Sequence, residues 1–206
     1  MNELFIIILS CIIGYSIGSF PTAYLVSKIK GVDVFTVGSR QAGATNVWKR
    51  VSKIGGINVF IIDVTKGSTT IIVAKILGLD GIILLLPSSF SILAHWNSPF
   101  TKFRGGDGVS TLAGISTAIA PHAVLPAFFI SGIIIILISR ITLHPSLWAG
   151  MAGYSIFVLL SFFEKTNVEI TVVLAITLMF IAVLTHSIIF HKRHKEYFNI
   201  AGKKTK

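Results

Sequence analysis

The sequence predicts an all-α protein, a polytopic bundle of transmembrane helices, from its composition, its long apolar runs and the placing of its basic residues. Of the 206 residues, 53% are hydrophobic and only 13% are charged, whereas a soluble domain is about 25% charged. The first apolar run, Leu4–Ser27, contains no charged residue and exceeds the roughly 20 residues that span a bilayer. Lipid cannot satisfy backbone polar groups, so these runs are expected to be helical.

Seven apolar segments are expected to cross the membrane, and residues 1–206 are expected to form one integral-membrane domain. The seven segments are Leu4–Ser27, Ile54–Gly78, Gly81–His95, Val109–Ala120, His122–Ser139, Ser146–Phe163 and Val168–His191. The first segment has no basic residues before it, so it is interpreted as a retained span rather than a signal peptide. Pro121 separates the fourth and fifth segments; the alternative is one bent helix and six spans, since proline occurs inside membrane helices.

The basic residues predict an orientation. If the N-terminus is outside, the inward-facing segments carry all of the 18 lysines and arginines except Lys66, Lys75 and Lys165. Inner loops are normally the basic ones, which favours seven spans with the C-terminus in the cytoplasm; six spans would put the basic tail outside. Attraction to the anionic inner leaflet explains the net charge of +10. A nucleic-acid partner is not expected, because the charge is spread over loops between spans.

The first inner loop combines glycines with hydroxyl, amide and cationic side chains. Its relevant members are Gly38, Ser39, Arg40, Thr45, Asn46, Lys49 and Arg50. Small residues let backbone N–H groups approach an anion, and the side chains add donors and charge. The loop therefore predicts a phosphate site, although it lacks the ending of a Walker loop. The alternative is an ordinary polar loop with surface cations.

The second inner loop places cations and glycines directly before a helix expected to start near Val109. They are Lys102, Arg104, Gly105, Gly106 and Gly108, and a glycine-rich helix start attracts anions. His95 ends the preceding span, where it can act as a general base on a water-soluble substrate or simply make a structural hydrogen bond. Asp107 either caps the helix or repels a bound phosphate.

Two charged residues lie within the second span. Asp63 and Lys66 are three residues apart and share a helix face, so an ion pair inside the bundle is expected; a direct role for Lys66 on substrate is the alternative. In the first span, Gly14 and Gly18 have the spacing of a close helix contact. Cys11, the one cysteine, is interpreted as a small apolar filler. No metal cluster or cofactor motif is seen.

Taken in order along the chain, these motifs resemble those of the membrane-embedded bacterial acyl-phosphate:glycerol-3-phosphate acyltransferases. The matching segments are Gly18, Ser19 and Pro21; residues 43–47 (Gly-Ala-Thr-Asn-Val); Asp63, Lys66 and Gly67; and residues 100–111 after His95. They keep the family's order and cover nearly the whole chain.

The resemblance implies transfer of a fatty acyl group from acyl phosphate to the sn-1 hydroxyl of glycerol 3-phosphate, giving lysophosphatidate and phosphate. It implies a multi-pass protein of the bacterial inner membrane, an active site facing the cytoplasm, no cofactor or metal, and an upstream enzyme that makes acyl phosphate. It makes His95 and Ser39 catalytic, with His95 orienting or deprotonating the acceptor hydroxyl. The residues expected to bind substrate are Gly38, Thr45, Asn46, Lys49, Lys102, Arg104, Gly105, Gly106, Gly108 and His194.

Some positions depart from the family's pattern. Asp107 replaces a lysine, Lys49 replaces an arginine that can bind phosphate bidentately, and Tyr197 stands where the last motif has asparagine. These departures keep open a catalytically degenerate paralogue with a binding role. A small-anion transporter is the other alternative; the candidate residues lie at span ends, however, whereas transporter sites usually lie at the bilayer midplane.

Overall fold

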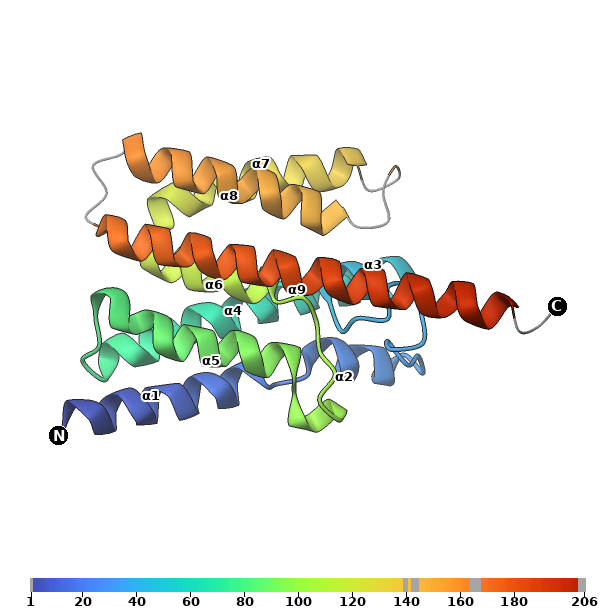
Figure 1. Cartoon of the computed structure of the whole chain (residues 1–206), viewed down its shortest axis with the longest axis horizontal. Helices are drawn as coiled ribbons and strands as arrows, with labels where there is room; N and C mark the ends of the chain where they lie inside the picture. Colours follow the sequence, from blue (N-terminus) through green and yellow to red (C-terminus); the bar gives the residue numbers. More distant parts are fainter. Residues whose placement is uncertain (1, 139–140, 142–144, 164–167, 204–206) are drawn as a thin grey trace.

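The computed structural model describes residues 2–138, 141, 145–163 and 168–203, and within them every regular element is a helix (Figure 1). Side chains are described except at 145–147, 162–163 and 191–203. The α-helices are α1 (Glu3–Gly18), α2 (Thr22–Ile29), α3 (Ala44–Arg50), α4 (Lys53–Ile76), α5 (Leu85–Trp96), α6 (Val109–Ile119), α7 (Pro121–Ile138), α8 (Pro145–Phe163) and α9 (Ile170–Lys203). Two short 3₁₀ helices are η1 (Gly81–Leu84) and η2 (Pro99–Thr101). The all-α prediction is confirmed.

The first apolar segment is not one continuous helix. α1 ends at Gly18 and α2 begins at Thr22, with Pro21 as its N-cap residue. Proline has no N–H to continue the hydrogen-bond ladder, so the break falls where the sequence places Pro21. The break leaves backbone carbonyls at the end of α1 available to other groups.

The fourth and fifth segments form separate helices. α6 ends at Ile119 and Pro121 begins α7, where a missing N–H costs nothing because the first turn has no partner for it. A single bent helix is therefore not formed. α1 begins at one end of the long axis of the molecule and α9 ends at the other (Figure 1).

Four helical stretches are long and apolar enough to cross a membrane: Glu3–Ile29, Lys53–Ile76, Pro121–Ile138 and Ile170–Phe190. Val109–Ile119 and Trp148–Ser161 are shorter apolar helices. With 11 residues, α6 is about 16 Å long at 1.5 Å per residue, against a hydrocarbon core of about 30 Å. Seven complete crossings therefore remain a prediction.

Glycines bring two helix pairs together backbone to backbone. A Cβ atom on Gly18 of α1 would collide with the Ser91 carbonyl of α5, and one on Gly114 of α6 with the Val64 carbonyl of α4. The close contact predicted for Gly14 and Gly18 is thus confirmed for the packing of α1 on α5. These contacts set α1, α4, α5 and α6 side by side, so that their loops meet at one end of the bundle.

Candidate active site

Asn46 organises the first loop (residues 30–43) from the start of α3. Its Oδ1 accepts a hydrogen bond from the Ser39 N–H at 3.2 Å. Its Nδ2 lies within hydrogen-bond distance of three backbone carbonyls, those of Val34, Val37 and Gln41, at 3.1, 3.1 and 2.9 Å. The side chain is buried and its amide is occupied by the loop. Asn46 therefore shapes the predicted phosphate loop, and the structure shows no spare donor for a direct contact with substrate.

Gly38 allows the first loop to close around Asn46. Its φ is +54°, and a Cβ atom there would collide with the Asn46 side-chain oxygen. The left-handed conformation is readily adopted by glycine. Arg40, two residues on, also has a positive φ of 58°, so the loop makes two sharp turns around Ser39. Gly38 is exposed, and its role here is conformational.

The second loop (residues 97–108) is bonded to the first. The Ala42 N–H donates to the Gly105 carbonyl at 3.1 Å, and the Gly106 N–H donates to the His95 carbonyl at 3.3 Å. The Ser98 hydroxyl donates to the Ser19 carbonyl at 2.6 Å. The two predicted phosphate loops, far apart in the sequence, therefore form one structural unit at the break between α1 and α2.

His95 is buried between this unit and α6. Its Nδ1 lies 3.3 Å from the Thr111 hydroxyl. A Cβ atom on Gly106 would lie 2.5 Å from His95 Nε2 and 2.6 Å from the Ala42 carbonyl. Only glycine therefore fits at position 106, and its backbone is the thin wall between His95 and the first loop.

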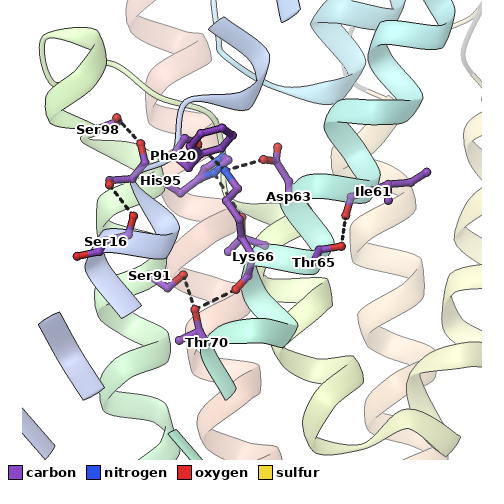
Figure 2. A network of polar contacts seen from close by, with 12 residues as sticks. Ser16, Phe20, Ile61, Asp63, Thr65, Lys66, Thr70, Ser91, His95 and Ser98 are labelled. Atoms are coloured by element: carbon purple, nitrogen blue, oxygen red, sulfur yellow. Dashed lines mark hydrogen bonds and ion pairs between the residues drawn. The ribbon is translucent and has the colours of Figure 1, made fainter. Parts of the chain in front are cut away.

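Asp63 and Lys66 form the ion pair that their spacing predicts. The Lys66 Nζ lies 2.7 Å from Asp63 Oδ1 and donates to the Phe20 carbonyl at 2.8 Å. Figure 2 shows Lys66 reaching from α4 to the break after α1, with His95 close by. A cation suits this position, since the carbonyl end of a helix carries a partial negative charge.

A large cavity has a polar mouth and an apolar interior. Its volume is about 370 Å³, and it lies between α4, α6, α7 and α8 beneath the first loop. Side chains at the mouth are Ser39, Gln41, Thr45, Asn46, Asp107 and Ser110. The interior is lined mainly by apolar side chains, among them Phe60, Val124, Ala127, Phe128, Ile135 and Phe157. Such a cavity suits an amphiphile with a polar head and a hydrocarbon tail.

A much smaller cavity lies on the other side of the close contact between Ala42 and Gly106. Its volume is about 10 Å³, about enough for one water molecule. Its charged and polar lining includes Asp63, Lys66, His95, Ser98, Thr101 and Arg104, and its backbone lining includes Gly105 and Gly106. The structure thus groups Ser39, Thr45 and Asn46 at one cavity, and His95, Arg104, Gly105 and Gly106 at the other.

The remaining predicted cations lie at the surface. Lys49 on α3 and Lys102 in the second loop are exposed, and the Arg104 guanidinium stacks 4.2 Å from the centre of the Phe35 ring. Although Lys49 is exposed, partial loss of hydration at its ammonium and, second, the neighbouring charge of Arg50 lower its pKa. The His194 side chain lies outside the described residues. Among those that are described, no three acidic, histidine or cysteine side chains could hold a metal ion.

Asp107 lies directly before Gly108, the N-cap residue of α6, and its side chain binds the first backbone N–H of that helix. Its Oδ1 accepts a hydrogen bond from the Val109 N–H at 3.1 Å, and its carbonyl accepts one from the Trp96 indole at 2.7 Å. Gly108, between them, has a φ of +87°. Burial raises the pKa of the Asp107 carboxyl. The predicted capping role is confirmed, and the carboxyl also lies at the mouth of the large cavity.

Three features of the site were not predicted. Gln41 is 4% exposed and lines the mouth of the large cavity, and within the described chain its Nε2 has no hydrogen-bond partner. The Trp96 ring stacks on His186 of α9 at 4.2 Å. Tyr154 reaches from α8 to α6 inside the cavity. Only Gln41, within a motif, carried a sequence signal; the other two depend on contacts between distant helices.

Comparison with known proteins identifies the family. A family model described as glycerol-3-phosphate acyltransferase matches residues 8–196. The chain belongs to this family. A glycerol-3-phosphate acyltransferase 2 from Dehalococcoides mccartyi is 32% identical over 203 residues, covering 98% of this chain and 92% of that protein. One from Thermus thermophilus is 33% identical over 143 residues, covering 69% and 71%.

Solved structures agree with this assignment. The crystal structure of PlsY (YgiH), an integral membrane glycerol 3-phosphate acyltransferase, in its glycerol 3-phosphate form aligns with a TM-score of 0.72 and 28% identity, covering 98% of this chain and 94% of that one. Its lysophosphatidic acid form aligns at 0.71 and 26%, covering 95% and 92%. The chain is therefore an integral-membrane acyltransferase, and family membership argues against the transporter alternative.

Proposed function

We propose that this acyltransferase takes its acyl group from acyl phosphate and transfers it to the sn-1 hydroxyl of glycerol 3-phosphate, releasing lysophosphatidate and inorganic phosphate. Acyl transfer to glycerol 3-phosphate follows from the family; the donor and the arrangement of the reaction are the proposal. The observation that carries it is the cavity of about 370 Å³, apolar inside and polar at its mouth, which matches a lipid-tailed anion.

The donor is proposed to enter tail first. Its hydrocarbon chain lies among the apolar side chains of α6, α7 and α8, and its phosphate remains at the mouth. There the hydroxyls of Ser39 and Thr45 and the amide of Gln41 are available as neutral donors. Neutral donors fixed in a partly buried site stabilise an anion without bringing a mobile counter-ion into lipid.

The acceptor is proposed to approach from the side of His95 and the second loop. Its hydroxyl oxygen attacks the acyl carbon, the bond between that carbon and the phosphate oxygen breaks, and phosphate leaves with the bonding electrons. The hydroxyl proton passes to His95, whose Nε2 faces the Gly106 wall. Arg104, Lys102 and Lys49 supply positive charge for the acceptor phosphate. For this attack the small cavity must widen, since it now has room for one water molecule, and it must open into the large cavity past the Ala42–Gly106 contact.

The proposal includes the cellular setting. The basic loops and tail favour a bacterial inner-membrane protein with the N-terminus outside, the C-terminus inside and the two loops facing the cytoplasm. Acyl phosphate would then come from an upstream enzyme that phosphorylates or transfers activated acyl groups. Glycerol 3-phosphate, a small charged molecule, would reach the loops from the cytoplasm.

Photoaffinity labelling tests the location. A lysophosphatidate analogue with a diazirine at the end of its acyl chain would be activated on the purified protein, and the labelled peptides mapped by mass spectrometry. The proposal expects labels on the cavity-facing residues of α6, α7 and α8, suppressed by unlabelled lysophosphatidate. Labels confined to outward-facing residues such as Ile12 and Ile61, both exposed, would place the acyl chain elsewhere.

A further inference from the structure

The large cavity extends from its polar mouth to an inner end between the helices, which we call its floor. On α6 its lining runs from Val109, beside the mouth, to Ser116. These positions are seven residues apart, which is about 10 Å at 1.5 Å per residue. α8 lines the same depth, and Tyr154 and Phe157 lie at its inner end.

A hydrogen bond between α6 and α8 crosses this floor. The Tyr154 hydroxyl lies 2.8 Å from Ser116 Oγ, and Ser116 Oγ itself donates to the Leu112 carbonyl at 2.9 Å. A serine hydroxyl has one hydrogen, so Tyr154 must be the donor to Ser116. Both buried hydroxyls are therefore satisfied without any ligand, and the bond fixes the phenol across the cavity.

The Tyr154 ring also packs against two phenylalanine rings. It stacks on Phe180 of α9, with ring centres 4.1 Å apart and planes 11° apart, and it meets Phe157 edge to face at 5.8 Å. Tyr154 is 9% and Phe157 2% exposed, so the phenol ring is packed between two aromatic rings on the sides away from the cavity. Interiors packed in this way resist displacement by a ligand.

We propose that Tyr154 is the floor of the acyl-chain site and sets the longest acyl chain that the enzyme uses efficiently. The inference rests on the proposed function, because it takes the cavity as the site of the donor's tail. The lining is about 10 Å deep along α6 and about 16 Å along α7, from Val124 to Ile135, so the cavity ends well short of the roughly 30 Å thickness of the hydrocarbon core. A tail longer than the cavity must bend at the ring or leave its end outside, and either loses apolar contact.

Assays with donors of different acyl-chain length test this inference. Wild type, Tyr154→Phe, Tyr154→Leu and Gly132→Leu would be assayed with saturated acyl phosphates that lengthen by one pair of methylenes at each step. Tyr154→Phe keeps the ring and should keep the wild-type profile. Tyr154→Leu removes the floor and should move the optimum to longer chains, with relative kcat/KM for the longest donor rising about tenfold, the effect of a methylene's fit in an apolar pocket.

Gly132→Leu supplies the opposite change. Gly132 lines the cavity on α7, and a Cβ atom there would have nothing within 4 Å. Leucine can therefore fill the cavity without a clash, and the optimum should move to shorter chains while the melting temperature is kept. An unchanged profile in both leucine variants overturns the inference. Failure of the wild type to use any acyl phosphate would instead refute the proposed function.

Discussion

The Lys66 ammonium lies 2.7 Å from the Asp63 carboxylate, and both side chains are buried where α4 passes the break between α1 and α2. Lys66 also donates to the Phe20 carbonyl, so a single cation neutralises an acid and binds the end of α1. Because the two opposite charges neutralise each other on one face of α4, we expect the loss of either to lower the free energy of unfolding more directly than it lowers the catalytic rate.

Asp63→Asn is expected to destabilise the protein strongly, since it leaves the Lys66 charge buried without its partner. Breaking a buried pair from one side costs about 3–5 kcal/mol. The double variant Asp63→Asn with Lys66→Met should recover most of that loss. Thermal unfolding in detergent measures both. Equal destabilisation in the single and double variants would show that the pair is not the cause.

His95→Gln is expected to lower kcat by about 10²-fold or more, which is the usual contribution of a general base. The buried ring also bonds Thr111, so Thr111→Val serves as the control: it removes that bond and leaves the imidazole in place. If His95 is the base, the Gln variant should lose far more activity than the Val variant at similar melting temperature. Comparable activity in the two would give His95 a positioning role only.

Two variants at Asp107 can separate the effect of its charge from the effect of its hydrogen bond to the start of α6. Asp107→Asn keeps an oxygen for the Val109 N–H and removes the charge, so KM for the anionic substrates should fall while stability is kept. Asp107→Lys loses the cap, at a cost of about 1 kcal/mol, and should melt earlier. An unchanged KM in the Asn variant would show that the carboxyl does not face a bound phosphate.

The same residue gives a pH dependence. Burial raises the pKa of the folded Asp107 carboxyl, so the unfolded chain loses its proton first as pH rises. Wild type is therefore expected to lose stability relative to Asp107→Asn as pH increases from below the unfolded pKa, about 3.9, to above the raised one. Unfolding in parallel pH series checks the sign; a gain for wild type over this window would contradict it.

The predicted orientation can be tested by labelling. In a Cys11→Ser background, a cysteine introduced at Thr205 should react with an impermeant thiol reagent only after the cells are opened. A cysteine introduced at Asn2 should react in intact cells. Labelling of the tail from outside would mean an even number of crossings.

Short-range features were predicted well because helix geometry fixes them. The three-residue spacing of Asp63 and Lys66 predicted the ion pair. Pro121 predicted the boundary at which α7 begins, and Asp107 predicted a side-chain hydrogen bond to the start of α6. The apolar segments were all found as helices in the described chain, apart from the break at Pro21 in the first.

Features that depend on how the helices meet were not predictable in this way. Asn46 was expected to bind phosphate, but a buried amide must satisfy its hydrogen bonds and the first loop supplies them all. His95 and Ser39 were expected at one site, yet the Ala42–Gly106 contact divides them between two cavities. The Tyr154–Ser116 bond joins residues 38 positions apart, a separation at which the sequence has no periodic signal.

Acyl transfer from acyl phosphate to glycerol 3-phosphate can be measured in a reconstituted assay. Purified protein in detergent or vesicles would receive labelled glycerol 3-phosphate with either acyl phosphate or acyl-CoA, with products resolved by chromatography and phosphate measured in parallel. We expect lysophosphatidate and phosphate in equal amounts when acyl phosphate is the donor, and neither with acyl-CoA. Absence of product with acyl phosphate, or robust turnover with acyl-CoA, would contradict it.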